Sequence, residues 1–324
     1  MIISKTPLRM SFVGGGSDLV DYYKHGFGAV TGVTIDKYVY ITVNQRFTDH
    51  IRIGYSQVEY VDKPENIKHN LAREALKLVG IKKGIEVVYM SDLLPAHEGS
   101  GLGASSSITV GTLNALYAFR GKHASPGTLA KQASKIEIDI LGQPIGKQDQ
   151  YAAAYGGFNY IRFNADGNVI VNPVICKRKD KLNRKLLLFY VGEKPKTSVV
   201  LNEQKRKTSK NLHILDQMVR LAKETRVALE KNDFSKFGEL LHQNWLYKQK
   251  LSSKISNPMI NEYYEKARKA GALGGKILGS GGGGFLLLYC EEKFQNKVRR
   301  YLKNLKETHF KFEPQGSRII YVSD

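Results

Sequence analysis

Apolar and polar residues alternate along several stretches of the first half of the chain, as in strands that bury one face. The alternation predicts strands from residue 2 towards the glycines at 14–16, over 30–43, more weakly over 51–61, and over 85–90. A hairpin is expected over 157–175, because Asp166-Gly167 is a turn dipeptide between apolar stretches.

Helical spacing of apolar residues lies between these strands. Residues 70–79 predict a short helix ending at Gly80, and 108–120 an apolar-faced helix ending at Gly121. Ser125-Pro126 has the form of an N-cap followed by proline at the first helical position, which predicts a helix running to about Leu141.

The second half of the chain is predicted to be richer in helices. Apolar residues recur at helical spacing from Leu212 to Ala222, and further helices are expected over 234–251 and 258–270. Strands are expected over 186–191, 276–289 and 317–322, with a helix over 293–305. The charged stretch 177–185 suggests a boundary, so the prediction is an α+β protein of two domains, 1–180 and 181–324.

Length and composition agree with a packed two-domain protein. The chain has 324 residues, of which 42% are hydrophobic. Its longest apolar stretch, 285–290, is too short to span a bilayer, and the first residues lack the apolar stretch of a signal peptide. Two cysteines cannot form a disulfide framework, which suggests a reduced, cytoplasmic protein.

Positive charge is concentrated in the second half. The net charge is +20, and residues 177–324 carry +17 of it. Such a field can attract nucleic acid, an anionic surface or a phosphorylated small molecule, although a lysine-rich solvated surface is the commonest meaning.

The segment 99–107, GSGLGASSS, carries the most chemical information. Alternate glycines let the backbone approach a ligand, and three serines then begin a helix whose free amides suit a phosphate chain. The spacing is neither that of a P-loop, since no Gly-Lys pair is followed by Ser or Thr, nor that of a Rossmann fingerprint. A flexible turn with a serine N-cap is the other interpretation.

Two further glycine clusters stand far from this one, at 14–18 and 279–284. Each leads from or into an apolar strand. Three such segments are better explained by backbone amides that converge on one polyanion than by three independent turns.

The three segments resemble, in order, the three motifs of the GHMP kinase superfamily: TPLRMSFVGGGSDL (6–19), GSGLGASSS (99–107) and ILGSGGGGFLLLY (277–289). The resemblance implies the GHMP kinase fold, with a left-handed β-α-β crossover in the N-terminal domain, a ferredoxin-like C-terminal domain and an active site between them. It also implies a cytoplasmic kinase that uses ATP and Mg²⁺.

Within the superfamily, residues 14–18 and GKQDQYAAAYGG (146–157) resemble the branch that phosphorylates the anomeric hydroxyl of sugars. Kinases of D-glycero-D-manno-heptose 7-phosphate, which serve the synthesis of nucleotide-activated heptose for surface polysaccharide, are the nearest kind. Fucokinase-like or other sugar 1-kinases are the alternative. The implied partners are ATP and a sugar phosphate, with no nucleic acid and no membrane, and the protein is expected to be a monomer or homodimer.

The resemblance assigns catalysis to Asp149 and Arg9. A cation beside a carboxylate keeps it ionised and stabilises charge at the attacking oxygen. Without the resemblance, Asp149 reads as a cap of the helix that follows it. The implied ATP-binding residues are Gly99, Ser100, Gly101, Leu102, Gly103, Ala104, Ser105 and Ser106.

The implied magnesium ligands are Glu137 and a serine, Ser105 first and Ser106 next, because Ala104 stands where relatives have the first serine of a pair. For Glu137 a solvated helix carboxylate is the alternative. His97 replaces a common proline and is either exposed or a phosphate contact. The implied substrate-binding residues are Gly15, Gly16, Ser17, Asp18, Lys196, Gly281, Gly282 and Gly283.

A nucleic-acid-binding protein is the competing hypothesis from another class, because the pI is near 9.7. The sequence lacks zinc-ligand spacing and an RNP-like aromatic motif, and its aromatic residues lie mostly within apolar strands and helices.

Overall fold

A computed structural model describes residues 1–93, 101–192 and 197–323. Within them, the first sheet has eight strands, in the order β12-β1-β2-β5-β3-β4, with β6 and β7 continuing from β2. Its strands are β1 (Ile2–Val13), β2 (Phe27–Gln45), β3 (Ile51–Gly54), β4 (Val58–Val61), β5 (Ile85–Ser91), β6 (Phe158–Asn164), β7 (Val169–Pro173) and β12 (Arg318–Val322).

Most pairs in this sheet are antiparallel, but β3 and β5 are parallel. The connection between them contains a helix, so this is the β-α-β crossover of the sheet; its left-handed sense stays a prediction. The helices of this half are α1 (Val20–Tyr23), η1 (Pro64–Asn66), α2 (Asn70–Val79), α3 (Ala104–Phe119), α4 (Pro126–Ser134), η2 (Lys135–Ile140) and α5 (Gln148–Tyr155).

The central helix α3 packs closely on β1 and β2. A side chain at Gly111 would meet the Thr6 hydroxyl at 2.7 Å and Ile41 at 3.2 Å, so the missing Cβ sets the approach of helix to sheet. The predicted helix from 126 changes to π-helical turns at Lys135. Such turns are frequent at functional sites, and this one carries Glu137.

The second sheet has the order β11-β8-β10-β9 and is antiparallel throughout. In the described part of the chain, four α-helices and one short 3₁₀ helix lie between β8 and β9, and one α-helix lies between β10 and β11. Together with the strand order, this gives the ferredoxin-like arrangement expected from the sequence. The elements are α6 (Lys179–Arg184), β8 (Leu186–Tyr190), α7 (Thr197–Lys207), η3 (Thr208–Asn211), α8 (Leu212–Glu230), α9 (Phe234–Leu251), α10 (Pro258–Ala270), β9 (Ala272–Ile277), β10 (Phe285–Cys290), α11 (Glu292–Tyr301) and β11 (Lys306–Glu307).

Three expectations from the sequence are corrected by this structure. Residues 276–289 form two strands, β9 and β10, because the glycines between them turn the chain back. The charged stretch 177–185, where no helix was predicted, contains a short helix, α6. The last strand, β12, pairs with β1 and so belongs to the first sheet, while the division at residue 180 stays a prediction.

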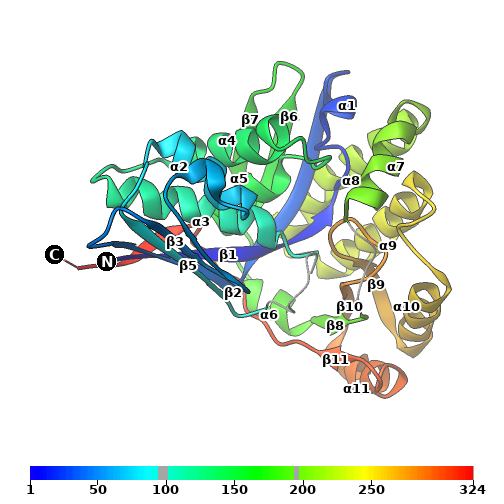
Figure 1. The fold of residues 1–324 in the computed structure, drawn as a ribbon. Helices are drawn as coiled ribbons and strands as arrows, with labels where there is room; N and C mark the ends of the chain where they lie inside the picture. Colours follow the sequence, from blue (N-terminus) through cyan, green and yellow to red (C-terminus); the bar gives the residue numbers. More distant parts are fainter. Residues whose placement is uncertain (94–100, 193–196, 324) are drawn as a thin grey trace.

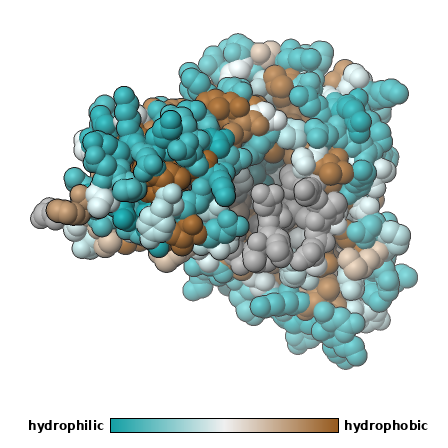
Figure 2. Space-filling view, in the orientation of Figure 1, coloured by the Kyte–Doolittle hydropathy of each residue, from teal (hydrophilic) through white to brown (hydrophobic). Residues whose placement is uncertain are grey.

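Figure 1 shows α2, α4 and α5 gathered over the large sheet and α7 to α10 gathered at the other end of the molecule. The two chain ends lie together, and the Met1 amine donates to the Ser323 hydroxyl at 2.7 Å. Hydrophilic side chains cover most of the coloured part of the face seen in Figure 2, including that near α7 and α10. No helix within the described residues is long and apolar enough to cross a membrane.

Candidate active site

Arg9 and Asp149 form a two-pronged ion pair between β1 and α5. Arg9 Nε and Nη2 donate to the two carboxylate oxygens, each at 2.7 Å. Its third nitrogen, Nη1, donates to the carbonyl of Gly101 at 2.6 Å. No side chain caps the start of α5, so Asp149 serves the arginine and not the helix end. Such paired, charge-assisted bonds fix geometry strongly.

The second and third glycine clusters meet beside this pair. A Cβ at Gly101 would lie 2.5 Å from the Leu278 carbonyl oxygen, and one at Gly279 would lie 2.5 Å from the Gly101 Cα. Gly101 and Gly103 also have φ near +80°, which side chains disfavour. These glycines are therefore required by the contact between two loops that are far apart in sequence.

The start of α3 offers the amides predicted to bind phosphate. Gly103 is its N-cap residue, and no side chain caps the first turn. Ser105 is exposed and Ser106 is buried, so the two candidate serines differ in access to a ligand. Gly99, Ser100, His97 and Lys196 lie outside the described residues.

Glu137 is fully buried, close to both the helix start and Asp149. It accepts hydrogen bonds from the Ser105 hydroxyl and from Gln150 Nε2, both at 2.6 Å. Burial raises the pKa of Glu137 to about 7, because its hydrogen bonds only partly replace the lost water. Because Glu137 is 0% exposed, the interpretation as a solvated helix carboxylate is wrong. Among the described residues, no lysine or arginine forms an ion pair with it.

The loop at 14–18 is tied to the start of α5 by Asp18. The Asp18 carboxylate accepts from the amides of Gly16, at 2.8 Å, and Gln148, at 3.3 Å. Burial, which is the largest cause, and the nearby Asp149 raise the pKa of Asp18. Asp18 is therefore held against Gln148, the residue that precedes Asp149.

Two parts of the predicted substrate set are held within the protein. The Ser17 hydroxyl is fully buried and bonds Gly14 and Ala29, so it stabilises its own loop. The Gly282 amide donates to Ile255, and a Cβ at Gly281 would lie 2.7 Å from the same carbonyl oxygen. The hypothesis that the amides of this cluster converge on an anion is thus wrong for Gly282, because its N–H already donates to the Ile255 carbonyl.

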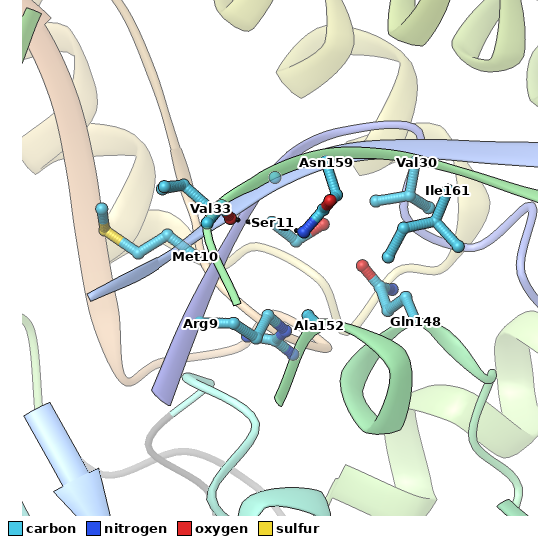
Figure 3. A pocket seen from close by; sticks show the side chains of 11 residues that line it. Arg9, Met10, Ser11, Val30, Val33, Gln148, Ala152, Asn159 and Ile161 are labelled. Atoms are coloured by element: carbon cyan, nitrogen blue, oxygen red, sulfur yellow. Dashed lines mark hydrogen bonds between the residues drawn. The ribbon is translucent and has the colours of Figure 1, made fainter. Parts of the chain in front are cut away.

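A small pocket lies beside Arg9 (Figure 3). Ser11 Oγ and Gln148 Oε1 are buried without a hydrogen-bond partner among the described residues, and both side chains flank Gly15. The lining is completed by Met10, Val30, Gly32, Val33, Ala152, Gly157, Asn159 and Ile161. The first glycine cluster therefore adjoins hydrogen-bonding groups that the protein leaves unused.

Sequence reasoning missed two buried lysines at this junction. Lys248 lies on α9 and donates to the Gly279 carbonyl at 2.5 Å. Lys276 lies in β9 and donates to the carbonyls of Ser11 and Phe12. A signal was present in both cases: Lys248 falls on the apolar stripe of its helix between Trp245 and Leu251, and Lys276 interrupts an apolar strand.

The chain matches two known sequence families. The GHMP kinases N terminal domain matches residues 67–157, and the GHMP kinases C terminal family matches residues 225–307. These ranges include the start of α3, Glu137, Asp149 and Lys248.

Several known proteins are similar over the whole chain. A D-glycero-alpha-D-manno-heptose 7-phosphate kinase of Campylobacter jejuni is 30% identical over 304 residues, which cover 90% of this chain and 89% of the relative. A mevalonate kinase of Methanothermobacter thermautotrophicus is 26% identical, covering 93% and 95% of the two chains. The structure of a D-glycero-D-manno-heptose 1-phosphate kinase from Bacteroides thetaiotaomicron has a TM-score of 0.82, with 27% identity and 100% coverage of both chains.

The two family matches fall one in each half of the fold, and the similarity to the Campylobacter relative runs through nearly all of the chain between them. This protein therefore belongs to the GHMP kinase family.

Proposed function

We propose that this GHMP kinase transfers the γ-phosphoryl group of ATP to the anomeric hydroxyl of D-glycero-D-manno-heptose 7-phosphate, which gives the 1,7-bisphosphate. The observation that carries the proposal is the three-way bonding of Arg9, which holds Asp149 with two nitrogens and the Gly101 carbonyl with the third. One side chain thereby fixes an acceptor-facing carboxylate relative to the nucleotide loop, and phosphoryl transfer depends mainly on such positioning.

The choice of acceptor is supported by the two heptose phosphate kinases among the similar proteins. Their names differ in the position of the phosphate, so the position is the finer part of the proposal. Asp18 is a buried carboxylate suited to accept from sugar hydroxyls. Beside Gly15, Ser11 and Gln148 present polar atoms that are unpaired among the described residues. Free fucose is the alternative acceptor.

In the proposed reaction Asp149 accepts the proton of the attacking hydroxyl or orients that hydroxyl, and Arg9 stabilises the charge that develops nearby. The side chain of Asp149 is 24% exposed and that of Arg9 only 6%, so the carboxylate keeps a free side while the arginine stays fixed. The amides at the start of α3 bind the phosphates of ATP.

Glu137 and Ser105 fit a magnesium site. Mg²⁺ prefers one or two protein oxygens together with phosphate oxygens and water, and these two oxygens lie 2.6 Å apart at the phosphate-binding helix start. A fully buried carboxylate with a raised pKa and no cationic partner among the described residues is a group that a cation would stabilise. When bound, the ion neutralises charge on the phosphate oxygens. Exposed Ser105 suits this role better than buried Ser106.

A panel of acceptors tests the proposal. ADP release is measured with heptose 7-phosphate, heptose 1-phosphate, free fucose and mevalonate, and the product is examined by phosphorus NMR. The expected result is the highest kcat/KM with heptose 7-phosphate and a new anomeric phosphate signal. Preference for heptose 1-phosphate or fucose, or a product without an anomeric phosphate, would contradict the proposed substrate.

A further inference from the structure

Lys248 is a buried cation whose hydrogen bonds are incomplete. The residue is 5% exposed, and its ammonium donates one bond, to the Gly279 carbonyl at 2.5 Å. Within the described ranges it forms no ion pair with a carboxylate. An ammonium has three donors, so two of them have no partner in the part of the chain that the structure describes and can bind a ligand.

The neighbouring Lys276 differs in this respect. It is 0% exposed, and its ammonium donates to the carbonyls of Ser11, at 2.7 Å, and Phe12, at 3.1 Å. These bonds connect β9 to the end of β1, so the Lys276 ammonium stabilises the contact between the two sheets. Among residues 1–93, 101–192 and 197–323, Lys248 has no comparable set of partners.

The charges around Lys248 leave an excess of positive charge. Arg9 from β1 and Lys276 from β9 repel its ammonium, while Asp18 from the 14–18 loop and Asp149 from α5 attract it. Arg9 binds Asp149, and Asp18 is bound by backbone amides. Three buried cations thus face two carboxylates, and an uncompensated buried charge is costly unless an anion joins it.

The position of Lys248 indicates which anion this is. Its acceptor, Gly279, contacts Gly101, and the Gly101 carbonyl in turn binds Arg9. Lys248 on α9 therefore binds one of the two touching loops, and Arg9 on β1 binds the other. The Gly101 loop leads into α3, and Arg9 also binds Asp149, so these contacts connect Lys248 to both the helix start and the carboxylate.

We propose that Lys248 is a further catalytic residue, which binds the γ-phosphoryl group of ATP together with Arg9. The inference rests on the proposed function. As the acceptor oxygen bonds to the γ-phosphorus, the bond to the β,γ-bridging oxygen breaks and its electron pair leaves with ADP. The hydroxyl proton passes to the Asp149 carboxylate, and Lys248 keeps its own proton throughout.

The test compares Lys248→Met with Lys250→Met, which removes an exposed lysine from the same helix. Dissociation constants are measured for ADP and for ATPγS, with Mg²⁺ and without acceptor. Lys248→Met is expected to weaken ATPγS binding 10- to 100-fold, the size of one charge-assisted contact, and ADP binding less than 3-fold. Lys250→Met should change neither. Because no acceptor is used, failure of the heptose assignment leaves this test intact.

An equal loss for ADP and ATPγS would mean that Lys248 only supports the glycine loop and would overturn the proposal. Unchanged ATPγS affinity in Lys248→Met would overturn it as well, since the lysine would then make no contact with the γ-phosphoryl group.

Lys248→Arg provides a second measurement that a structural role would not affect. Burial, followed by the nearby Arg9, lowers the pKa of Lys248 to about 8 despite Asp18 and Asp149. In the wild type, ATPγS affinity should therefore fall as the pH rises from 7 to 9.5, because the ammonium is lost. Arginine stays charged over this range, so the variant should show a flat profile. A fall that persists in Lys248→Arg would contradict the proposal.

Discussion

At the residue scale, Arg9 connects the Asp149 carboxylate to the loop before α3. Its three hydrogen bonds go to two residues, Gly101 and Asp149, which lie 92 and 140 residues away in the chain. The planar guanidinium can hold a carboxylate and a carbonyl at fixed angles, which a lysine could not. The alignment of Asp149 with the nucleotide loop therefore depends on this one side chain.

Asp149→Asn is expected to lower kcat by about 10²–10⁴-fold, the usual contribution of a general base, with ATP affinity changed less than 3-fold. The matched control is Asp139→Asn, an exposed carboxylate in the preceding helical segment, which should keep normal turnover. Steady-state kinetics and equilibrium ATP binding check both variants. Near-normal turnover of Asp149→Asn would remove the assigned role.

Glu137→Gln is expected to make the protein more stable at pH 8 while abolishing magnesium-dependent turnover. The folded pKa of Glu137 is about 7, against an ordinary value of 4.5. A raised carboxyl pKa contributes stability below pH 4.5 that is lost as the pH rises to 7. At pH 8 the variant should gain about 1–3 kcal/mol in free energy of unfolding, and at pH 4 almost nothing.

Urea unfolding at both pH values measures this difference. Asp139→Asn again serves as control, since that carboxylate is exposed. A stability gain of the same size at pH 4 and pH 8 would show that burial of the Glu137 charge is not its cause.

At the scale of elements, the site is made where two turns touch. The turn before α3 and the turn between β9 and β10 approach so closely that Gly101 and Gly279 leave no space for a side chain. Both turns were recognisable from their glycines. Their contact was not, because it depends on how the second sheet packs against the first.

Gly101→Ala and Gly121→Ala separate this contact from backbone strain. Both glycines have positive φ, +80° and +66°, but a Cβ at Gly121 meets nothing within 4 Å. Both variants should lose about 1 kcal/mol of stability from the backbone. Gly101→Ala should lose a further ~1–3 kcal/mol by overpacking and bind ATP at least 10-fold more weakly. Thermal unfolding and ATP titration give the comparison; equal losses would contradict the contact.

At the scale of the whole molecule, the two halves depend on each other. Strand β12 completes the edge of the first sheet beside β1. The Thr31 hydroxyl donates to the Ala222 carbonyl of α8 at 2.7 Å, and the Gly14 amide donates to Asn244 of α9 at 3.1 Å. Lys276 adds its two bonds to the end of β1.

A fragment of residues 1–180 is therefore expected to lack cooperative unfolding, because it exposes the β1 edge and the contacts of α8 and α9. The full chain should unfold in one transition. Urea unfolding followed by circular dichroism tests both. A cooperative transition of the fragment, with a slope suited to its size, would mean that the first half folds alone.

The sequence by itself determined the elements with strong local patterns and the motifs that carry chemistry. The helices 70–79, 234–251 and 258–270 were predicted with the bounds observed, since caps and apolar spacing are local signals. The three glycine segments predicted a site for a polyanion, and their resemblance to the GHMP kinase motifs implied the kinase.

Only the tertiary structure decided which groups remain available to a ligand. The Ser17 hydroxyl and the Gly282 amide form hydrogen bonds within the protein, and Glu137 is buried. Lys248 and Lys276 lie close to Arg9. The tertiary structure also placed the last strand in the first sheet. Burial, charge and pairing of this kind depend on residues far apart in the chain, and a local pattern does not record them.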